Sequence, residues 1–359
     1  RGLGDVYKRQ VLNGVFINGQ WQAGHEVLEV INPATEATLA HVSVGDASAV
    51  ELAVDAASAA FVDWSKSSGR DRGALLRKVA QGVSEQREQL MQLQSSNNGK
   101  PLFEASIDVD DVIATFEYYA GICDAMDAGQ DCKVALPSDD FSARMRREPC
   151  GVVGLIVPWN FPMVTTAWKL APALAAGCCV VLKPSEVTPL AELQLARIIA
   201  EAGFPAGVFN LVCGTGLAVG APLAADRRVA KISFTGSNAV GVQVMQRAAE
   251  TIKGVSLELG GKSSLLVLAD ADLDLAVELA CGGGFFNAGQ ICSATSRVLV
   301  ADNLADEFLQ RLQARAEGIR VADPFAEDVE MGALINRAQY QRVLGHIPVS
   351  YTHLRAHAT

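Results

Sequence analysis

Short β-branched runs alternate with helical segments from Gly151 onward, and this alternation restricts the fold more than any other feature of the sequence. The runs occupy residues 152–157, 179–183, 208–212, 229–234 and 265–268. The helical segments between them occupy residues 170–176, 190–202, 218–225 and 239–249. Strand–helix alternation at this spacing is typical of a parallel, doubly wound sheet. The sequence therefore predicts an α/β fold.

The part of the chain before Gly151 predicts a hairpin, several helices and a ribbon. Residues 16–21 form a hairpin pattern with Asn18 and Gly19 at the turn. Apolar residues at helical spacing predict helices over 46–61, 70–94 and 108–125. The polar, strand-like stretch 133–147 predicts a protruding ribbon.

Composition excludes several classes of protein. Half of the 359 residues are hydrophobic and 19% are charged, which supports a large core and, at this length, two packed units. The net charge of −10 argues against a nucleic-acid or anionic-membrane surface. No apolar run approaches the ~18–20 residues of a membrane-spanning helix, and the N-terminus lacks a signal-peptide pattern. We expect a soluble, cytoplasmic protein.

The eight cysteines are expected to be reduced thiols. None forms a Cys-x-x-Cys pair and there are only five histidines, which argues against a zinc site. Cys178 and Cys179 lie in an apolar stretch and are predicted to be buried. Cys292 instead follows Gly289 and Gln290, where a thiol can be exposed. A nucleophilic cysteine needs access, a lowered pKa and donors for the oxyanion, but spacing alone leaves the structural alternative open.

Two other residues carry groups suited to this chemistry. Glu258 lies beside the paired glycines Gly260 and Gly261, and a carboxylate near apolar side chains can act as a general base. The alternative is an edge-strand glutamate in water. Asn160 lies between Pro158 and Pro162. Its amide could donate to an oxyanion or could simply cap a helix.

Three loops after predicted strands suit a nucleotide. Residues 214–220 are glycine-rich but one residue longer than the usual dinucleotide fingerprint, so by itself this loop favours an ordinary glycine-rich strand–helix turn. Ser237, after Gly236, is placed to cap a helix whose N-terminus suits a pyrophosphate. Lys183 could meet an adenosine ribose, and Glu186 could bind its hydroxyls and repel a 2′-phosphate, or be a solvated charge.

Five motifs occur in a fixed order: PWNFP (158–162), KPSE (183–186), FTGS (234–237), LELGGKS (257–263) and FNAGQICS (286–293). In order and separation this set resembles the aldehyde dehydrogenase superfamily, from Phe16 to about Ile347. The resemblance implies an aldehyde dehydrogenase-like fold: a doubly wound Rossmann-type cofactor domain, an α/β catalytic domain and an oligomerisation ribbon. It also implies NAD-dependent oxidation of an aldehyde to a carboxylic acid through a cysteine thiohemiacetal and thioester, with NAD preferred over NADP.

The resemblance assigns a role to each motif residue. It makes Cys292 the nucleophile, Glu258 the general base, Asn160 with the Cys292 backbone N–H the oxyanion hole, and Lys169 a proton-relay lysine. The residues implied to bind the cofactor are Val157, Pro158, Trp159, Lys183, Ser185, Glu186, Gly216, Gly236, Ser237 and Leu259.

The implied domain limits follow the motifs. Residues 11–130 and 150–258 would form the NAD-binding domain, 131–149 the oligomerisation ribbon of a homodimer or homotetramer, and 259–347 an incomplete catalytic domain. Residues 1–10 and 348–359 look foreign to the rest. The family continues beyond the point matching Ile347, so we expect this chain by itself to be poorly folded or inactive.

The subgroup of closest resemblance is the betaine-aldehyde and aminoaldehyde dehydrogenases, on the runs 108–112, 116–120, 147–149 and 292–297. These enzymes hold a cationic nitrogen against aromatic faces, which implies substrate contacts by Phe161, Trp168 and Phe286. Phe161 and Phe286 occupy positions where these relatives often carry Tyr and Trp. Because phenylalanine is the weaker cation–π partner, the preference for a quaternary ammonium is weakened. The subgroup also implies a potassium ion on backbone oxygens of Ile31, Asn97 and Val187, although Asn97 replaces the usual Asp.

Other functions stay open from the sequence. The chain could oxidise succinate semialdehyde or a general aliphatic aldehyde, but no arginine lies beside Phe161, Trp168 or Phe286 to bind a second carboxylate. A CoA-acylating enzyme is disfavoured because Glu258 suits water as the acyl acceptor. A non-catalytic structural or binding protein would not need the four residues Cys292, Glu258, Asn160 and Lys183 together.

Overall fold

A computed structural model describes residues 11–357, so the predicted foreign tail at 1–10 lies outside the described residues. The chain forms two compact units. The first contains the described residues up to Val30, with Thr38–Leu93 and Ser106–Leu259. The second contains Ile31–Ala37, Gln94–Ala105 and the chain from Gly260 onward. Two of its segments, Ile31–Ala37 and Gln94–Ala105, fall within the range 11–130 that the sequence assigned to the cofactor domain.

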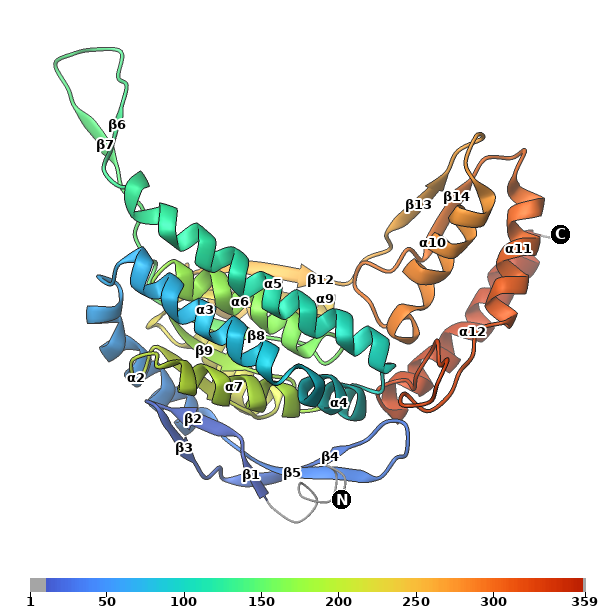
Figure 1. Ribbon diagram of the computed structural model, residues 1–359, viewed down its shortest axis with the longest axis horizontal. Coiled ribbons are helices and arrows are strands. Elements are labelled where there is room, and N and C mark those ends of the chain that lie inside the picture. Colours follow the sequence, from blue (N-terminus) through green and yellow to red (C-terminus); the bar gives the residue numbers. More distant parts are fainter. Residues whose placement is uncertain (1–10, 358–359) are drawn as a thin grey trace. The chain divides into compact units, whose positions relative to one another are not determined.

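The first unit is built on a seven-stranded sheet (Figure 1). Its parallel part has the order β12-β11-β8-β9-β10, and the hairpin β2-β3 continues it antiparallel to β10. The parallel strands are β8 (Val152–Ile156), β9 (Cys179–Lys183), β10 (Phe209–Val212), β11 (Val229–Gly236) and β12 (Gly254–Leu259). The predicted parallel, doubly wound sheet is confirmed.

The hairpin at the sheet edge is confirmed as well. Strands β2 (Val15–Ile17) and β3 (Gln20–Gln22) pair antiparallel across Asn18 and Gly19. Both turn residues have positive φ, 53° and 79°, as a two-residue Asn-Gly turn requires. A second sheet, with the order β1-β5-β4, was not predicted. Its strands are β1 (Val11–Asn13), β4 (Glu26–Ile31) and β5 (Thr38–Val44).

Helices cover both faces of the large sheet. Helices α6 (Pro162–Ala175) and α7 (Leu190–Ala202) pack together under α3 (Gly69–Glu85). Helices α2 (Ala47–Trp64), α8 (Ala221–Ala225) and α9 (Asn238–Ala249) form the other layer. The chain winds from β8 through β9 to β10 and then returns to the other side of β8. Because such crossovers are right-handed, the reversal places the later helices on the opposite face.

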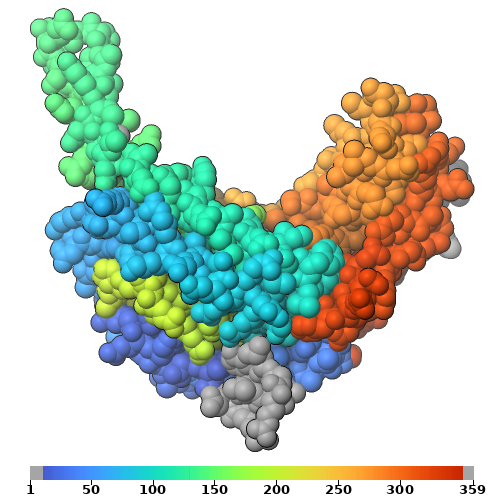
Figure 2. Space-filling model, in the orientation of Figure 1, coloured from blue at the N-terminus to red at the C-terminus, as the bar shows by residue number. Residues whose placement is uncertain are grey.

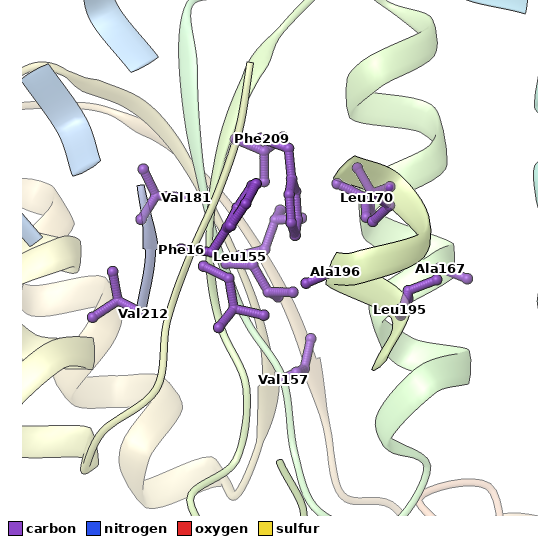
Figure 3. Packing of buried hydrophobic residues seen from close by; sticks show 14 of the residues in the cluster. Phe16, Leu155, Val157, Ala167, Leu170, Val181, Leu195, Ala196, Phe209 and Val212 are labelled. Carbon is purple, nitrogen blue, oxygen red and sulfur yellow. The ribbon is translucent and has the colours of Figure 1, made fainter. Parts of the chain in front are cut away.

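The core lies between the sheet and these helices. All residues of β8, β9 and β10 are buried, as expected for parallel strands covered on both faces. Figure 3 shows Phe16 and Phe209 beside Leu155, facing Leu170 of α6 and Ala196 of α7. The rings of Phe16 and Phe209 lie 6.1 Å apart between centroids.

Several predicted helix limits need correction. The single helix predicted over 70–94 is two helices, α3 and α4 (Arg87–Asn98), because the backbone leaves the helical region at Gln86 (φ −107°, ψ 16°). Helix α6 begins at Pro162, eight residues before the predicted segment 170–176, since proline is favoured in the first helical turn. The helix predicted over 108–125 is α5 (Leu102–Met126).

The predicted ribbon is present in the first unit. Strands β6 (Cys132–Val134) and β7 (Ala143–Met145) pair antiparallel after the short helix η1 (Asp127–Gly129). Figure 1 shows them extending beyond the end of α5, and their residues form the green projection in Figure 2. Phe141, between the strands, is 74% exposed.

The second unit contains a smaller sheet and its helices. Strand β13 (Ser264–Val267) pairs in parallel with β14 (Arg297–Val300), so the run 265–268 is a strand but does not join the large sheet as predicted. Helices α10 (Leu273–Phe285) and α11 (Ala305–Glu317) enclose a core around Phe308. Helix α12 (Arg337–His357) continues through Pro348, across the predicted limit of the C-terminal tail.

None of the helices within residues 11–357 has both the length and the apolar character required to cross a membrane.

Candidate active site

Most of the predicted cofactor residues lie at one edge of the large sheet. Strands β8, β9, β10, β11 and β12 are parallel, so their carboxyl ends meet at the same edge. Each of these ends is followed by, or contains, predicted residues: Val157–Trp159, Lys183–Glu186, Gly216, Gly236–Ser237 and Leu259. Ligands of open α/β sheets bind at this edge, where the strand order reverses. Here the reversal lies between β8 and β11.

Lys183 and Glu186 form an ion pair at the end of β9. Lys183 Nζ lies 3.1 Å from Glu186 Oε2, and it also donates to the carbonyl of Pro184. The lysine side chain is 4% exposed, while the glutamate side chain is 35% exposed. Lys183 is therefore fixed in place, and the Glu186 carboxylate remains open to a polar ligand.

The loops after β10 and β11 both start helices. Thr215 caps the turn η2 (Gly216–Gly220), with its Oγ1 3.1 Å from the N–H of Ala218. Ser237 is the N-cap of α9 as predicted and accepts from the N–H of Val240. An added Cβ at Gly216 would meet no atom within 4 Å, so its backbone is open. Two helix N-termini thus lie on the ligand edge, where free backbone N–H groups favour phosphate.

Asn160 lies in the loop between β8 and α6 and is half-buried. The loop is held on both sides. The carbonyl of Trp159 accepts from Thr188 Oγ1 at 3.4 Å, and the carbonyl of Phe161 accepts from Thr165 at the start of α6. Asn160 therefore lies in a held loop at the reversal of strand order, beside the edge that carries the predicted cofactor residues.

Lys169 is a buried cation in α6. Its Nζ donates to Ser233 Oγ of β11 at 3.0 Å. Burial lowers the pKa of Lys169 to about 8, against the opposing effect of the negative charge of Glu258. Glu258 itself is exposed on β12, the edge strand of the sheet. The first unit therefore brings Lys169 into the electrostatic range of Glu258.

Trp168 belongs to a polar aromatic pocket that the motifs did not identify. Its Nε1 donates to Asp111 Oδ2 at 3.0 Å. Asp111, Tyr118, Tyr119 and Trp168 line a cavity of about 280 Å³ between α5 and α6. Desolvation raises the pKa of Asp111, while the hydrogen bond from Trp168 lowers it. Asp111 lies in the run 108–112, but 57 residues separate it from Trp168, so only the fold reveals the pairing.

Cys292 lies in the second unit and is exposed. The preceding turn has a rare conformation, because Asn287, Ala288 and Gly289 all have positive φ (50°, 55° and 74°). Three hydrogen bonds hold the turn: Asn287 N–H to Glu104 Oε1, Gln290 Nε2 to the Asn287 carbonyl, and Ile335 N–H to Gln290 Oε1. Strained backbone of this kind clusters at functional sites. Sequence alone gave no signal for it, since alanine rarely adopts positive φ.

The remaining predicted residues are divided between the units. Phe286 packs edge-to-face on Phe103 in the second unit, with centroids 6.4 Å apart, whereas Phe161 belongs to the first. Ile31 and Asn97 belong to the second unit, and Val187 to the first. No cluster of three or more His, Cys, Asp and Glu side chains suited to a metal occurs among residues 11–357.

Comparison with known proteins agrees with this geometry. The model of the "Aldehyde dehydrogenase family" matches residues 21–352. Betaine aldehyde dehydrogenase 1 of Oryza sativa subsp. japonica is 46% identical over 93% of this chain and 68% of its own length. Aminoaldehyde dehydrogenase 2 (peroxisomal) of Pisum sativum is 46% identical over 92% of this chain and 67% of its own.

A solved structure of similar fold is betaine aldehyde dehydrogenase from Staphylococcus aureus in complex with NAD⁺. Its TM-score is 0.93 at 36% identity, over 97% of this chain and 69% of that one. The described chain therefore has the same fold as an NAD⁺-binding relative over nearly its whole length.

Proposed function

The chain belongs to the aldehyde dehydrogenase family, and from this premise we propose that it oxidises aldehydes carrying a cationic nitrogen to carboxylic acids with NAD. Betaine aldehyde and aminoaldehydes are the substrates we expect. Three steps support the proposal: the thiol chemistry, the fit of the cofactor, and the charge of the substrate pocket.

Cys292 is the proposed nucleophile. Its exposed thiol follows a strained, tightly hydrogen-bonded turn, an arrangement that fixes the backbone around a reacting sulfur. The thiolate adds to the carbonyl carbon of the aldehyde, and the carbonyl electrons move to oxygen. In this proposal the Asn160 amide and the Cys292 backbone N–H donate to that oxyanion. Covalent addition is needed because an aldehyde itself is a poor hydride donor, whereas the thiohemiacetal oxyanion is a good one.

Glu258 and Lys169 are proposed to complete the reaction. Oxidation of the adduct leaves a thioester on Cys292, and Glu258 removes a proton from the water that attacks it. The Cys292 thiolate leaves, and the carboxylic acid is released. Lys169 is buried with a pKa lowered to about 8, so it can exchange a proton near neutral pH. We propose that it takes the proton onward from Glu258.

The residues of the sheet edge fit NAD. When bound there, NAD would supply the hydride acceptor that oxidation of the adduct on Cys292 requires. Glu186 has a carboxylate held 3.1 Å from Lys183, which suits the two hydroxyls of an adenosine ribose and disfavours a 2′-phosphate. Gly236 and Ser237 begin α9, where a pyrophosphate would meet backbone N–H groups. We propose that Val157, Pro158, Trp159, Ser185, Gly216 and Leu259 line the same groove.

The substrate class rests on one observation, the pairing of Asp111 with Trp168 in an aromatic pocket. A carboxylate with aromatic faces attracts an ammonium group by charge and by cation–π interaction. The same pocket repels a carboxylate such as that of succinate semialdehyde. The names of the rice and pea relatives agree with this assignment. Phe161 and Phe286 are proposed as further apolar contacts of the substrate.

Substitution of Asp111 tests the assignment. In Asp111→Asn the kcat/KM for aminobutyraldehyde and betaine aldehyde should fall about tenfold, the effect of losing roughly 1.4 kcal/mol of ion pairing. The kcat/KM for an uncharged aldehyde of the same length should not change. Asp110→Asn is the matched control, because Asp110 binds Arg87 instead and does not line the pocket. Preference of the unmodified protein for succinate semialdehyde would refute the substrate class.

Three further features belong to the proposal. We propose homo-oligomer assembly through the ribbon, and a potassium ion on backbone oxygens of Ile31, Asn97 and Val187. A cytoplasmic location stays a prediction. Named relatives include a peroxisomal enzyme of Pisum sativum and a chloroplastic enzyme of Amaranthus hypochondriacus.

A further inference from the structure

Two cysteines outside the site described above lie close together at the start of adjacent strands. Cys150 Sγ and Cys178 Sγ are 3.7 Å apart. Cys150 precedes β8 and Cys178 precedes β9, and these strands pair in parallel with Val152 opposite Cys179. Both thiols are free. We propose that Cys150 and Cys178 form a reversible disulfide, a redox-modification site separate from Cys292.

The two thiols differ in their exposure to solvent, as an attacking and a resolving cysteine do. Cys150 is exposed, whereas Cys178 is buried with 4% exposure. The neighbouring residues Pro149 and Ala176 line a cavity of about 1070 Å³, and the exposed Cys150 is the thiol that solvent reaches. An oxidant therefore meets Cys150 first, and Cys178 lies behind it as the resolving thiol.

Electrostatics favour the same order of reaction. Hydrogen bonding between the two sulfurs lowers the pKa of Cys150, and the positive charge of Lys231 lowers it further. The same hydrogen bond and burial raise the pKa of Cys178. Burial alone raises the pKa of the adjacent Cys179 to about 12, so that thiol does not meet the oxidant first either. A thiolate reacts with oxidants and a thiol does not, so Cys150 attacks.

The backbone allows the bond to form without loss of the fold. Cys178 is fixed, because its N–H donates to the Ala173 carbonyl at 3.0 Å and its carbonyl accepts from Trp64 Nε1 at 3.1 Å. Cys150 follows the returning leg of the ribbon and is the partner that can move. Its sulfur must approach by about 1.6 Å to reach the ~2.05 Å length of a disulfide.

The reaction balances with a peroxide as oxidant. The Cys150 thiolate attacks one peroxide oxygen, the O–O bond breaks, and the hydroxide released takes a proton to become water. Cys178 then attacks the sulfur of the Cys150 sulfenic acid, the S–O bond breaks, and the thiol proton of Cys178 leaves with the hydroxyl as a second water. Two thiols are oxidised and one hydrogen peroxide is reduced. A dithiol reductant reverses the modification.

The test uses the full chain with its other exposed cysteines replaced. The double variant Cys132→Ser, Cys292→Ser keeps six of the eight thiols. Addition of a few equivalents of hydrogen peroxide should lower the free-thiol count of the denatured protein from six to four. Peptide mapping without reductant should show the Cys150 and Cys178 peptides joined, with loss of two hydrogens, and dithiothreitol should restore both.

Single variants distinguish the proposal from general oxidation. Adding Cys150→Ser or Cys178→Ser to that background should abolish the linked peptide. Cys150→Ser is the decisive one, because the exposed position tolerates serine even if Cys178→Ser impairs folding. Oxidation of Cys150 to the sulfinic acid without any link to Cys178 would overturn the proposal. So would a link between Cys150 and any other cysteine.

Discussion

Lys169 is a buried lysine of the first unit. A lysine is rarely 9% exposed without a partner, and here the partners are the Ser233 hydroxyl and the charge of Glu258. Burial disfavours its charged form more than Glu258 favours it, so the pKa falls to about 8. With a pKa of about 8, Lys169 changes its protonation state close to neutral pH.

Lys169 also predicts how stability depends on pH. The folded pKa of about 8 lies below the unfolded value of 10.5. Between these values the unfolded chain binds more protons, so stability should rise as pH increases from 8 to 10.5. Lys169→Met should remove this rise. The other titratable groups are the same in both proteins, so the difference between the two pH profiles reports Lys169. Urea unfolding at pH 7, 9 and 10 measures the difference, and parallel pH profiles would contradict the prediction.

Substitution of Glu186 should change the preference for NAD over NADP. In Glu186→Gln a charged acceptor becomes neutral, which costs ~1.5–3 kcal/mol for hydrogen bonds to a charged group. We expect kcat/KM for NAD to fall at least about tenfold, and that for NADP to fall less or to rise. The NAD/NADP ratio, measured by steady-state kinetics, is the readout. Glu201→Gln, exposed at the end of α7, is the control and should leave the ratio unchanged.

At the scale of elements, helix α2 depends on Asp46, the N-cap residue that precedes it, more than on charges at its two ends. Asp46 caps it by accepting from the N–H groups of Ser48 and Ala49 at 2.9 and 3.2 Å. The helix has no acidic residue in its first turn and no basic residue in its last. Its inner face, including Val50, Ala53 and Val54, is buried against the large sheet.

Asp46→Ala should therefore destabilise the protein by about 1 kcal/mol, the usual effect of losing an N-cap. Asp46→Asn keeps an acceptor and should restore most of the loss. Hydrogen bonding to Ser48 lowers the pKa of Asp46, so the stabilisation is present above the unfolded pKa and is lost as pH falls through the folded value. Chemical denaturation at pH 7 and pH 3 tests both statements. An unchanged stability in Asp46→Ala at pH 7 would show that the cap is unimportant.

Local patterns predicted those elements whose signals lie within a few residues. Asn18 and Gly19 predicted their turn, Asp46 began a helix where expected, and β-branched runs marked β8 and β9. The prediction that the run 265–268 joins the large sheet was wrong, because β13 pairs with β14 some thirty residues later. Nothing within a strand specifies so distant a partner.

In the candidate site, too, local motifs predicted some residues, while contacts between distant segments appeared only in the structure. Motifs and resemblance named Lys183, Glu186 and Ser237, and the parallel sheet gathers their loops on one edge. The Asp111–Trp168 pair joins α5 to α6 and needed three-dimensional structure. The same is true of the Cys150–Cys178 pair and of the positive φ of Ala288. Each depends on packing between segments that are distant in sequence or on strain that packing maintains.

At the scale of the whole molecule, the ribbon of the first unit is a two-stranded, largely exposed element. A two-stranded hairpin alone is at best marginally stable in water. All three residues of β6 are exposed, as are Phe141 and Met145. Exposed apolar side chains on a narrow ribbon agree with the assembly proposed above. A second copy of the chain would cover them most simply, since most soluble oligomers are symmetric assemblies of one chain.

Phe141→Asp should therefore lower the oligomeric state. Burying an added carboxylate in an apolar interface costs several kcal/mol per copy, enough to shift a dimer or tetramer toward smaller species at micromolar concentration. Sedimentation velocity measures the change, and circular dichroism checks that the unit stays folded. Ser84→Asp, an equal change of charge on exposed α3, should leave the sedimentation coefficient unchanged. If Phe141→Asp sediments like the unmodified protein, the ribbon does not mediate assembly and its apolar residues require a different partner.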